Sequence, residues 1–169
     1  SSMCFAAKYP ERTFGLILFE AVSLSQDFMS EDEQLIKSWD YKLFIQLWFL
    51  TSFGDSRLAE TMLPNKKNRS RLLNNKQNIA QLKKIIWSIW PISIRRIGVE
   101  NDYKQFSNLT IPFDKICCPT LIIHGDEDKN VDITHAKNAH DSISNSSLYI
   151  VKEGDHMMHA THPEEIESR

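Results

Sequence analysis

The chain has 169 residues, of which 41% are hydrophobic and 25% are charged, and its formal net charge is −2. This length suits one domain of ordinary size, and the nearly balanced charge does not indicate nucleic acid or an anionic membrane as a partner. The longest apolar run, from Leu43 to Leu50, is far shorter than the roughly 20 residues of a transmembrane helix. We expect a soluble cytoplasmic protein that acts on a small molecule and needs no cofactor.

Three short apolar runs predict buried β-strands. They are GLILFEAV from Gly15 to Val22, PTLIIHG from Pro119 to Gly125, and SSLYIVKEG from Ser146 to Gly154. Between the second and third runs, residues 132–143 carry apolar side chains at helical spacing. Strands that alternate with a helix in this way predict an α/β fold with a parallel sheet.

The middle of the chain is different in character. Apolar side chains recur at helical spacing in residues 32–50 and again in residues 79–90, which predicts two amphipathic helices. All four tryptophans fall in this region, whereas all six histidines lie between His124 and His162. We therefore predict a core made of residues 1–29 and 106–169, interrupted by a helical insertion at 30–105.

Large apolar side chains of the insertion are candidates for lining a substrate cavity. Ordinary helix packing uses the same residue types, so both interpretations stay open. The candidates for substrate contact are Trp39, Leu43, Trp48 and Trp87.

An acidic segment, HGDEDKNV, follows the second predicted strand directly. Catalytic groups gather at the carboxyl ends of parallel strands, because loops there can change without disturbing the core. A lone aspartate in such a turn is also common for local reasons, since its carboxylate bonds nearby backbone amides. Asp126, Glu127 and Asp128 all lie at this strand end and are candidate catalytic acids.

Three histidines follow the third strand in EGDHMMHATHPEE. Gly154 would let the chain bend so that His156 points back over the sheet edge, where it would meet Asp128 if the two strands are neighbours. An aspartate bonded to one imidazole nitrogen leaves the other nitrogen free to act as a base. His156 is the candidate base.

The same three histidines could instead hold a metal ion. On one helix His156, His159 and His162 would spread across about 120° and rise about 9 Å, too far for three ligands of one small ion. Pro163 also biases His162 away from helical geometry. We predict no metal site, with a metal-dependent hydrolase as the weakest alternative.

Taken in order, these segments resemble the α/β-hydrolase family. The resemblance rests on YPER followed by GLILFEAV, on PTLIIHGDEDKNV and on EGDHMMHATHPEE, with a helical insertion like a cap between them. It implies that Asp128, three residues after a strand-ending glycine, is the acid, and that His156, seven residues before Pro163, is the histidine of a catalytic triad. It also implies hydrolysis of an ester, amide or related bond.

The family's nucleophile motif, G-x-S-x-G, does not occur in this sequence. Ser2 would leave only a short helix before YPER and has no glycine after it. The resemblance therefore implies the C-terminal part of a hydrolase, whose nucleophile, serine or aspartate, lies upstream of Ser1. The missing N-terminal portion becomes a possible partner, and the chain alone is expected to be inactive.

Glu20 is an alternative to Asp128, because it follows the first strand at a position that some hydrolases use for the acid. We favour Asp128, whose surroundings fit the usual acid loop better. A different class of function is also open: a binding or interaction protein that retains the hydrolase scaffold without catalysis.

Overall fold

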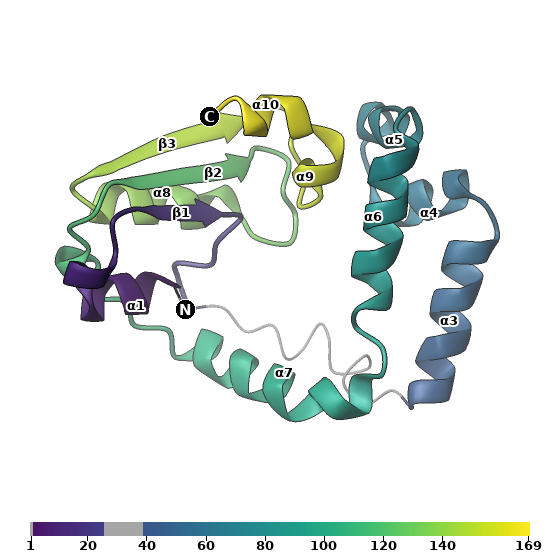
Figure 1. Ribbon diagram of the computed structural model, residues 1–169, viewed down its shortest axis with the longest axis horizontal. Coiled ribbons are helices and arrows are strands. Elements are labelled where there is room, and N and C mark those ends of the chain that lie inside the picture. The colour runs from purple at the N-terminus through teal and green to yellow at the C-terminus, as the bar shows by residue number, and fades with distance from the viewer. Residues whose placement is uncertain (1, 26–38) are drawn as a thin grey trace. The chain divides into compact units, whose positions relative to one another are not determined.

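A parallel sheet of three strands organises one part of the molecule. The computed structural model describes residues 2–25 and 39–169. Its strands are β1 (Leu16–Phe19), β2 (Thr120–Gly125) and β3 (Ser146–Val151), with β2 in the centre and all arrows pointing the same way (Figure 1). The predicted α/β class with a parallel sheet is confirmed.

The described residues form two compact units. The first, here called the sheet unit, comprises residues 2–25, 108–158 and 164–169. The second, here called the helical unit, comprises residues 39–107 and 159–163. The role of a cap for residues 30–105, and the limits of a core at 1–29 and 106–169, stay predictions.

Helices α1 (Ser2–Lys8) and α8 (Ile133–Ser142) supply the apolar cover for one face of the sheet. Leu18 and Ile122 are register partners that point to this face, and each is only 2% exposed. Burying a leucine or isoleucine to this extent contributes about 1.5–3 kcal/mol. The N-terminus of α8 is capped by the Asp132 carboxylate, which accepts a hydrogen bond from the Thr134 amide at 2.8 Å.

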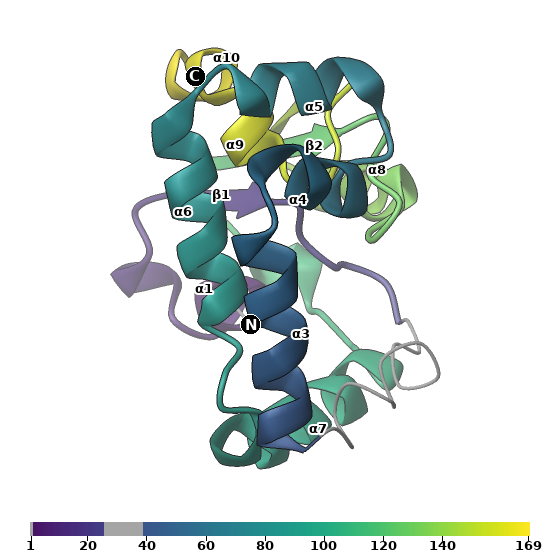
Figure 2. The same cartoon turned by 90° about the vertical axis from the view of Figure 1, so that its right-hand side faces the viewer.

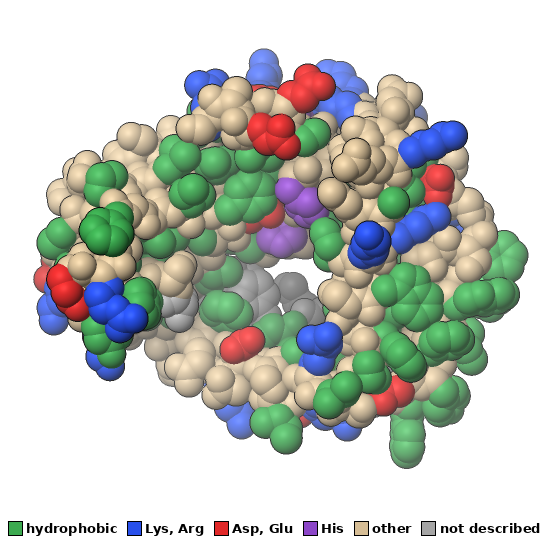
Figure 3. Space-filling model, in the orientation of Figure 1, with side chains coloured by type: hydrophobic (Ala, Val, Ile, Leu, Met, Phe, Trp, Pro, Cys, Tyr) green, Lys and Arg blue, Asp and Glu red, His purple; other side chains and the backbone are tan. Residues whose placement is uncertain are grey.

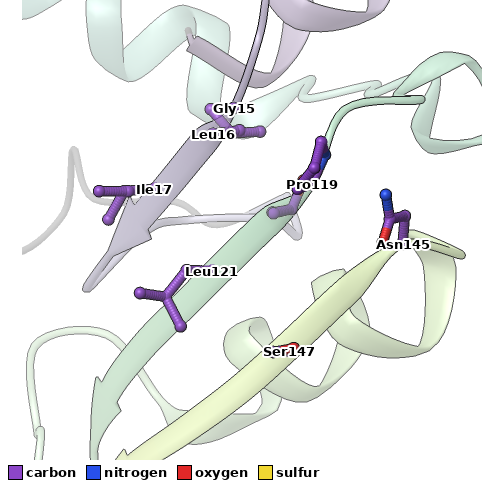
Figure 4. A pocket seen from close by; sticks show the side chains of 8 residues that line it. Gly15, Leu16, Ile17, Pro119, Leu121, Asn145 and Ser147 are labelled. Carbon is purple, nitrogen blue, oxygen red and sulfur yellow. The ribbon is translucent and has the colours of Figure 1, made fainter. Parts of the chain in front are cut away.

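The opposite face is covered at the carboxyl ends of the strands and open at their amino ends. Helices α9 (Met158–Thr161) and α10 (Pro163–Glu167) supply Met158 and Ile166, which pack near Ile123. At the amino end, Ile17 is 66% exposed and borders a shallow pocket that Leu121 also lines (Figure 4). Within the described chain β1 pairs only with β2, so its other edge presents unpaired backbone groups.

Five of the described helices lie entirely within the helical unit. They are α3 (Asp40–Ser52), α4 (Asp55–Met62), α5 (Lys66–Leu73), α6 (Lys76–Trp87) and α7 (Ile92–Ser107). Helices α3 and α6 lie side by side (Figures 1 and 2), and the Trp87 indole donates a hydrogen bond to Thr51 Oγ1 at 3.1 Å. Over the described ranges, no helix has both the length and the apolar character needed to cross a bilayer.

The two helices predicted for the insertion are found with different limits. Helix α3 begins at Asp40, and residues 32–38 of the predicted helix lie outside the described residues. Leu43 is buried, which fits the interpretation of ordinary helix packing. Trp39 is 69% exposed and precedes the helix in an extended conformation, with ψ 141°. Trp90 likewise lies beyond the end of α6 rather than on its apolar face.

Residues 159–163, which follow the predicted base, pack with the helical unit. The Asn78 side-chain amide donates to the Ala160 carbonyl at 2.8 Å, and the Arg71 guanidinium contacts Nε2 of His162. Two short 3-10 turns, at Pro10–Arg12 and Phe113–Lys115, complete the sheet unit.

Two glycines allow the ends of β2 and β3 to touch. A Cβ at Gly125 would lie 2.2 Å from the Gly154 carbonyl oxygen, closer than any side chain tolerates. Across this contact the Glu127 amide donates to the Gly154 carbonyl at 2.9 Å, and the Asp126 amide donates to the Val151 carbonyl at 3.2 Å. The two loops that leave these strands are thereby joined backbone to backbone.

Gly125→Ala should therefore destabilise the chain, because the added methyl group forces the two loops apart. We expect a loss of about 1–3 kcal/mol in the free energy of unfolding, measured by urea denaturation. Gly98→Ala is the matched control: its Cβ meets no atom within 4 Å, and alanine inside a helix is favoured over glycine by about 0.5–1 kcal/mol. Equal unfolding midpoints for the two variants would contradict the role of the glycine contact.

Candidate active site

Asp128 is held by the loop that leaves β2. It lies three residues after Gly125, and its side chain is fully buried. One carboxylate oxygen, Oδ1, accepts hydrogen bonds from the Asn130 amide at 2.8 Å and the Val131 amide at 3.0 Å. This local turn fixes the carboxylate and leaves the second oxygen, Oδ2, for another partner.

That partner is His156, on the loop that leaves β3. The distance from His156 Nδ1 to Asp128 Oδ2 is 2.8 Å, and the histidine side chain is 33% exposed. Because an ionised carboxylate can only accept, Nδ1 carries the hydrogen and Nε2 is left as the basic nitrogen. The structure thus brings together the two residues that the sequence singled out.

The pairing shifts the pKa values of both groups. The hydrogen bond to Asp128 raises the pKa of His156 above its ordinary value, although burial of the ring opposes this. Burial alone would raise the pKa of Asp128, but the hydrogen bonds from His156 and from the Val131 and Asn130 amides outweigh it and lower that pKa. The pair is therefore stabilised as carboxylate and imidazolium.

The bend that aims His156 does not arise where the sequence predicts it. Glu153, rather than Gly154, has a left-handed backbone, with φ 59°. Gly154 is required instead for its close approach to Gly125. The prediction that Gly154 makes the turn was therefore wrong. The left-handed turn is made by Glu153, which has a side chain, and the glycine is needed where the backbone approaches Gly125.

Glu20 joins the same cluster from a third strand. It follows β1 directly and has φ 49°. One potential ligand atom from each of Glu20, Asp128 and His156 lies within 4.8 Å of the other two. Burial raises the pKa of Glu20 to about 8, the Asp128 charge adds to the shift, and the His156 charge opposes it.

This cluster is the one group of three potential metal ligands found over the described residues. The predicted alternative of a site built on His156, His159 and His162 has no such cluster in this part of the chain. A cation bound at Asp128 Oδ2 and His156 Nδ1 would have to displace their mutual hydrogen bond. The arrangement therefore favours proton transfer over metal binding.

Three other histidines have structural partners. His124 is fully buried, and its Nε2 donates to the Val131 carbonyl at 2.9 Å. His135 accepts backbone hydrogen bonds from Ser23 and Leu24 at Nδ1, which ties the segment after Glu20 to α8. His140 lies 2.9 Å from the Ser146 hydroxyl.

The predicted substrate residues all belong to the helical unit. Leu43 is 2% exposed and packs inside that unit, whereas Trp48 is 46% exposed. Hydrophobic side chains gather on the surface over α3 (Figure 3), and the exposed large hydrophobic residues of this helix are Tyr41, Phe44, Ile45, Trp48 and Phe49. A role in substrate binding for Trp39, Leu43, Trp48 and Trp87 stays a prediction.

Two parts of the site carry only a weak signal in the sequence. The amides of Asn130 and Val131 hold Asp128, and the D-x-N spacing from Asp128 to Asn130 is typical of such a turn. Gly125 is recognisable as the end of a strand, but its contact with Gly154 depends on the pairing of β2 with β3.

Solved structures share this fold. An α/β-hydrolase fold protein from Nakamurella multipartita matches with a TM-score of 0.80 and 22% identity, over 96% of this chain and 60% of that one. A thermophilic esterase from Thermogutta terrifontis matches with a TM-score of 0.59 and 19% identity, over 99% and 57%. A meta-cleavage product hydrolase from Pseudomonas fluorescens IP01 matches with a TM-score of 0.63 and 17% identity, over 99% of this chain and 57% of that one.

At these identities the structural matches show the fold alone, and this chain spans less than two thirds of the length of each protein. No curated protein matches the sequence significantly. A family model described as serine aminopeptidase, S33, matches residues 2–165, nearly the whole chain. The chain therefore belongs to this family of α/β-hydrolases.

Proposed function

We propose that the chain carries the acid and the base of a catalytic triad that hydrolyses an ester, amide or related bond of a small molecule. The observation that supports this proposal most strongly is the 2.8 Å hydrogen bond between Asp128 Oδ2 and His156 Nδ1. A buried carboxylate, fixed by two backbone amides and paired with a partly exposed imidazole, has the geometry that acyl transfer requires.

In this mechanism His156 Nε2 removes the proton of the nucleophile as the nucleophile attacks the carbonyl carbon. The imidazolium that forms is stabilised by the Asp128 carboxylate and then donates its proton to the leaving group. In the second half of the reaction the same nitrogen removes a proton from water, which attacks the acyl intermediate. The imidazolium then returns this proton to the nucleophile as the bond between the acyl group and the nucleophile breaks. Asp128 orients the ring throughout and keeps its own charge.

The nucleophile is proposed to lie in a segment N-terminal to Ser1. The G-x-S-x-G motif does not occur in this sequence, and the chain spans 60% of the length of the Nakamurella protein. A serine would lose its proton to His156, whereas an aspartate would attack already ionised and leave His156 to activate the water. The N-terminal portion of the same protein would then be the partner that completes the site.

Exposed aromatic side chains of the helical unit support a substrate with an apolar part. Trp39 and Trp48 are 69% and 46% exposed. We propose these two and Trp87 as substrate contacts. Leu43 is 2% exposed, so it would support these side chains from inside the helical unit rather than touch the substrate.

Replacing His156 by glutamine should abolish hydrolysis in a protein that includes the upstream coding segment. We expect kcat/KM on short-chain p-nitrophenyl esters to fall by about 10³-fold or more, because the base is lost while the shape of the side chain is roughly kept. The matched control is His140→Gln, which replaces a histidine of α8 that lies beside the Ser146 hydroxyl and should change kcat/KM less than about 3-fold.

Hydrolysis that survives in His156→Gln would contradict the proposed base. A native protein that binds such esters without turnover would favour the alternative of a non-catalytic binding protein. The 169-residue chain alone is expected to show no hydrolysis that depends on His156.

The rate should depend on pH through His156. Since the hydrogen bond to Asp128 raises the pKa of His156 above 6.5, the basic form accumulates only above that pH, and kcat/KM should reach half its maximum on the acid side above pH 6.5. Asp128→Asn removes the charge, so the midpoint should move to lower pH while the maximal rate falls. Asp126→Asn, at an exposed position of the same loop, should leave the midpoint in place; an unmoved midpoint in Asp128→Asn would contradict the assignment.

A further inference from the structure

The backbone of β1 determines where the Glu20 carboxyl lies. The Glu20 amide donates to the Ile123 carbonyl at 3.1 Å, which continues the pairing of β1 with β2 by one residue. Three residues later, the Ser23 amide donates to His135 Nδ1 at 3.0 Å. The residue is thus anchored on both sides, and its left-handed backbone turns the side chain toward the cluster at the strand ends.

Two carboxyl groups therefore lie beside one imidazole, but their hydrogen bonding differs. Asp128 accepts three hydrogen bonds, from Asn130, Val131 and His156. Glu20 Oε1 is buried and has no hydrogen-bond partner among the described residues. A buried carboxyl group in such a place is more stable with its proton than without it.

The surrounding charges act on Glu20 in opposite directions. Burial and the negative charges of Asp128 and Asp155 raise its pKa to about 8, against the opposing effects of the His156 charge and the Met158 amide. Asp128, by contrast, has a lowered pKa. At neutral pH the two carboxyl groups thus hold opposite protonation states, and a rise in pH adds a second negative charge next to His156.

We propose that Glu20 is a positioning residue for His156: a second carboxyl within 4.8 Å of the Asp128–His156 pair that, once ionised, stabilises the imidazolium together with Asp128. The ionisation releases one proton to solvent and breaks no other bond. In Asp128→Asn, the Glu20 carboxylate becomes the charge nearest to the imidazolium and partly replaces Asp128. The catalytic consequence rests on the proposed function, whereas the electrostatic coupling does not.

The coupling can be measured on the 169-residue chain without any activity. We would follow the His156 imidazole by NMR between pH 5 and 10 in the native chain, Glu20→Gln, Asp128→Asn and the double variant. The glutamine amide resembles a protonated glutamic acid, so native and Glu20→Gln spectra should agree near pH 6 and diverge above pH 8. In Asp128→Asn the pKa of His156 should exceed that in the double variant by about one unit.

Several controls keep this result interpretable. Glu11→Gln, at an exposed position of the same unit, should leave the titration of His156 unchanged. Should Glu20→Gln fail to fold, Glu20→Asp can take its place because it retains an ionisable carboxyl. The NMR titration of His156 in Glu20→Asp must then still show two coupled titration steps, one for the imidazole and one for the carboxyl. The proposal would be overturned if the pKa of His156 agreed within about 0.2 units in Asp128→Asn and the double variant. An ionised carboxylate at about 4–6 Å should shift that pKa measurably.

The second readout uses the protein with its upstream segment. Asp128→Asn should retain at least about 10-fold more hydrolysis than the double variant, and this remainder should increase with pH as Glu20 ionises. Equal rates for the two variants would overturn the proposal if the native protein is active. If the native protein is inactive, the proposed function fails, and the NMR comparison alone decides the role of Glu20.

Discussion

The contact between Gly125 and Gly154 is the constraint on which the site depends. A Cβ at Gly125 would lie 2.2 Å from the Gly154 carbonyl oxygen, so the loops after β2 and β3 can join only while both residues lack side chains. The backbone bonds across this contact set the separation of the two loops. A 2.8 Å hydrogen bond between Asp128 and His156 follows from that separation, because each residue lies only a few positions beyond its glycine.

The cluster at the strand ends also separates two chemically similar groups. Backbone amides and an imidazole bind the Asp128 oxygens and lower its pKa, whereas burial raises the pKa of Glu20 to about 8 against the effect of the Met158 amide. Neighbouring carboxyl groups whose pKa values are pushed apart commonly perform different tasks in one site. Here the difference arises from the loop after β2, which folds its own amides around Asp128.

Much of the sheet unit follows from sequence patterns. Apolar runs bounded by glycine predict β2 and β3, and the helical spacing between them predicts α8, because local patterns suffice when strand and helix alternate. Positions after strand ends narrowed the acid to three neighbouring residues and indicated His156, and the resemblance to α/β-hydrolases selected Asp128. The left-handed turn at Glu153 and the glycine contact could not be predicted, since both depend on how β2 and β3 pair. Helices α4, α5 and α7 were not predicted, and α7 has no clear apolar stripe: Ile94 and Ile97 are 77% and 82% exposed.

Two glutamates beside the site, Glu20 and Glu153, hold left-handed backbones that glycine would adopt more easily. Each carries a strain of roughly 1 kcal/mol. A screen that selects only for thermal stability would therefore favour glycine at both positions. At position 153 that change keeps the pair of Asp128 and His156, whereas at position 20 it removes a carboxyl from the cluster. Position 20 is thus where selection for stability and selection for chemistry oppose each other.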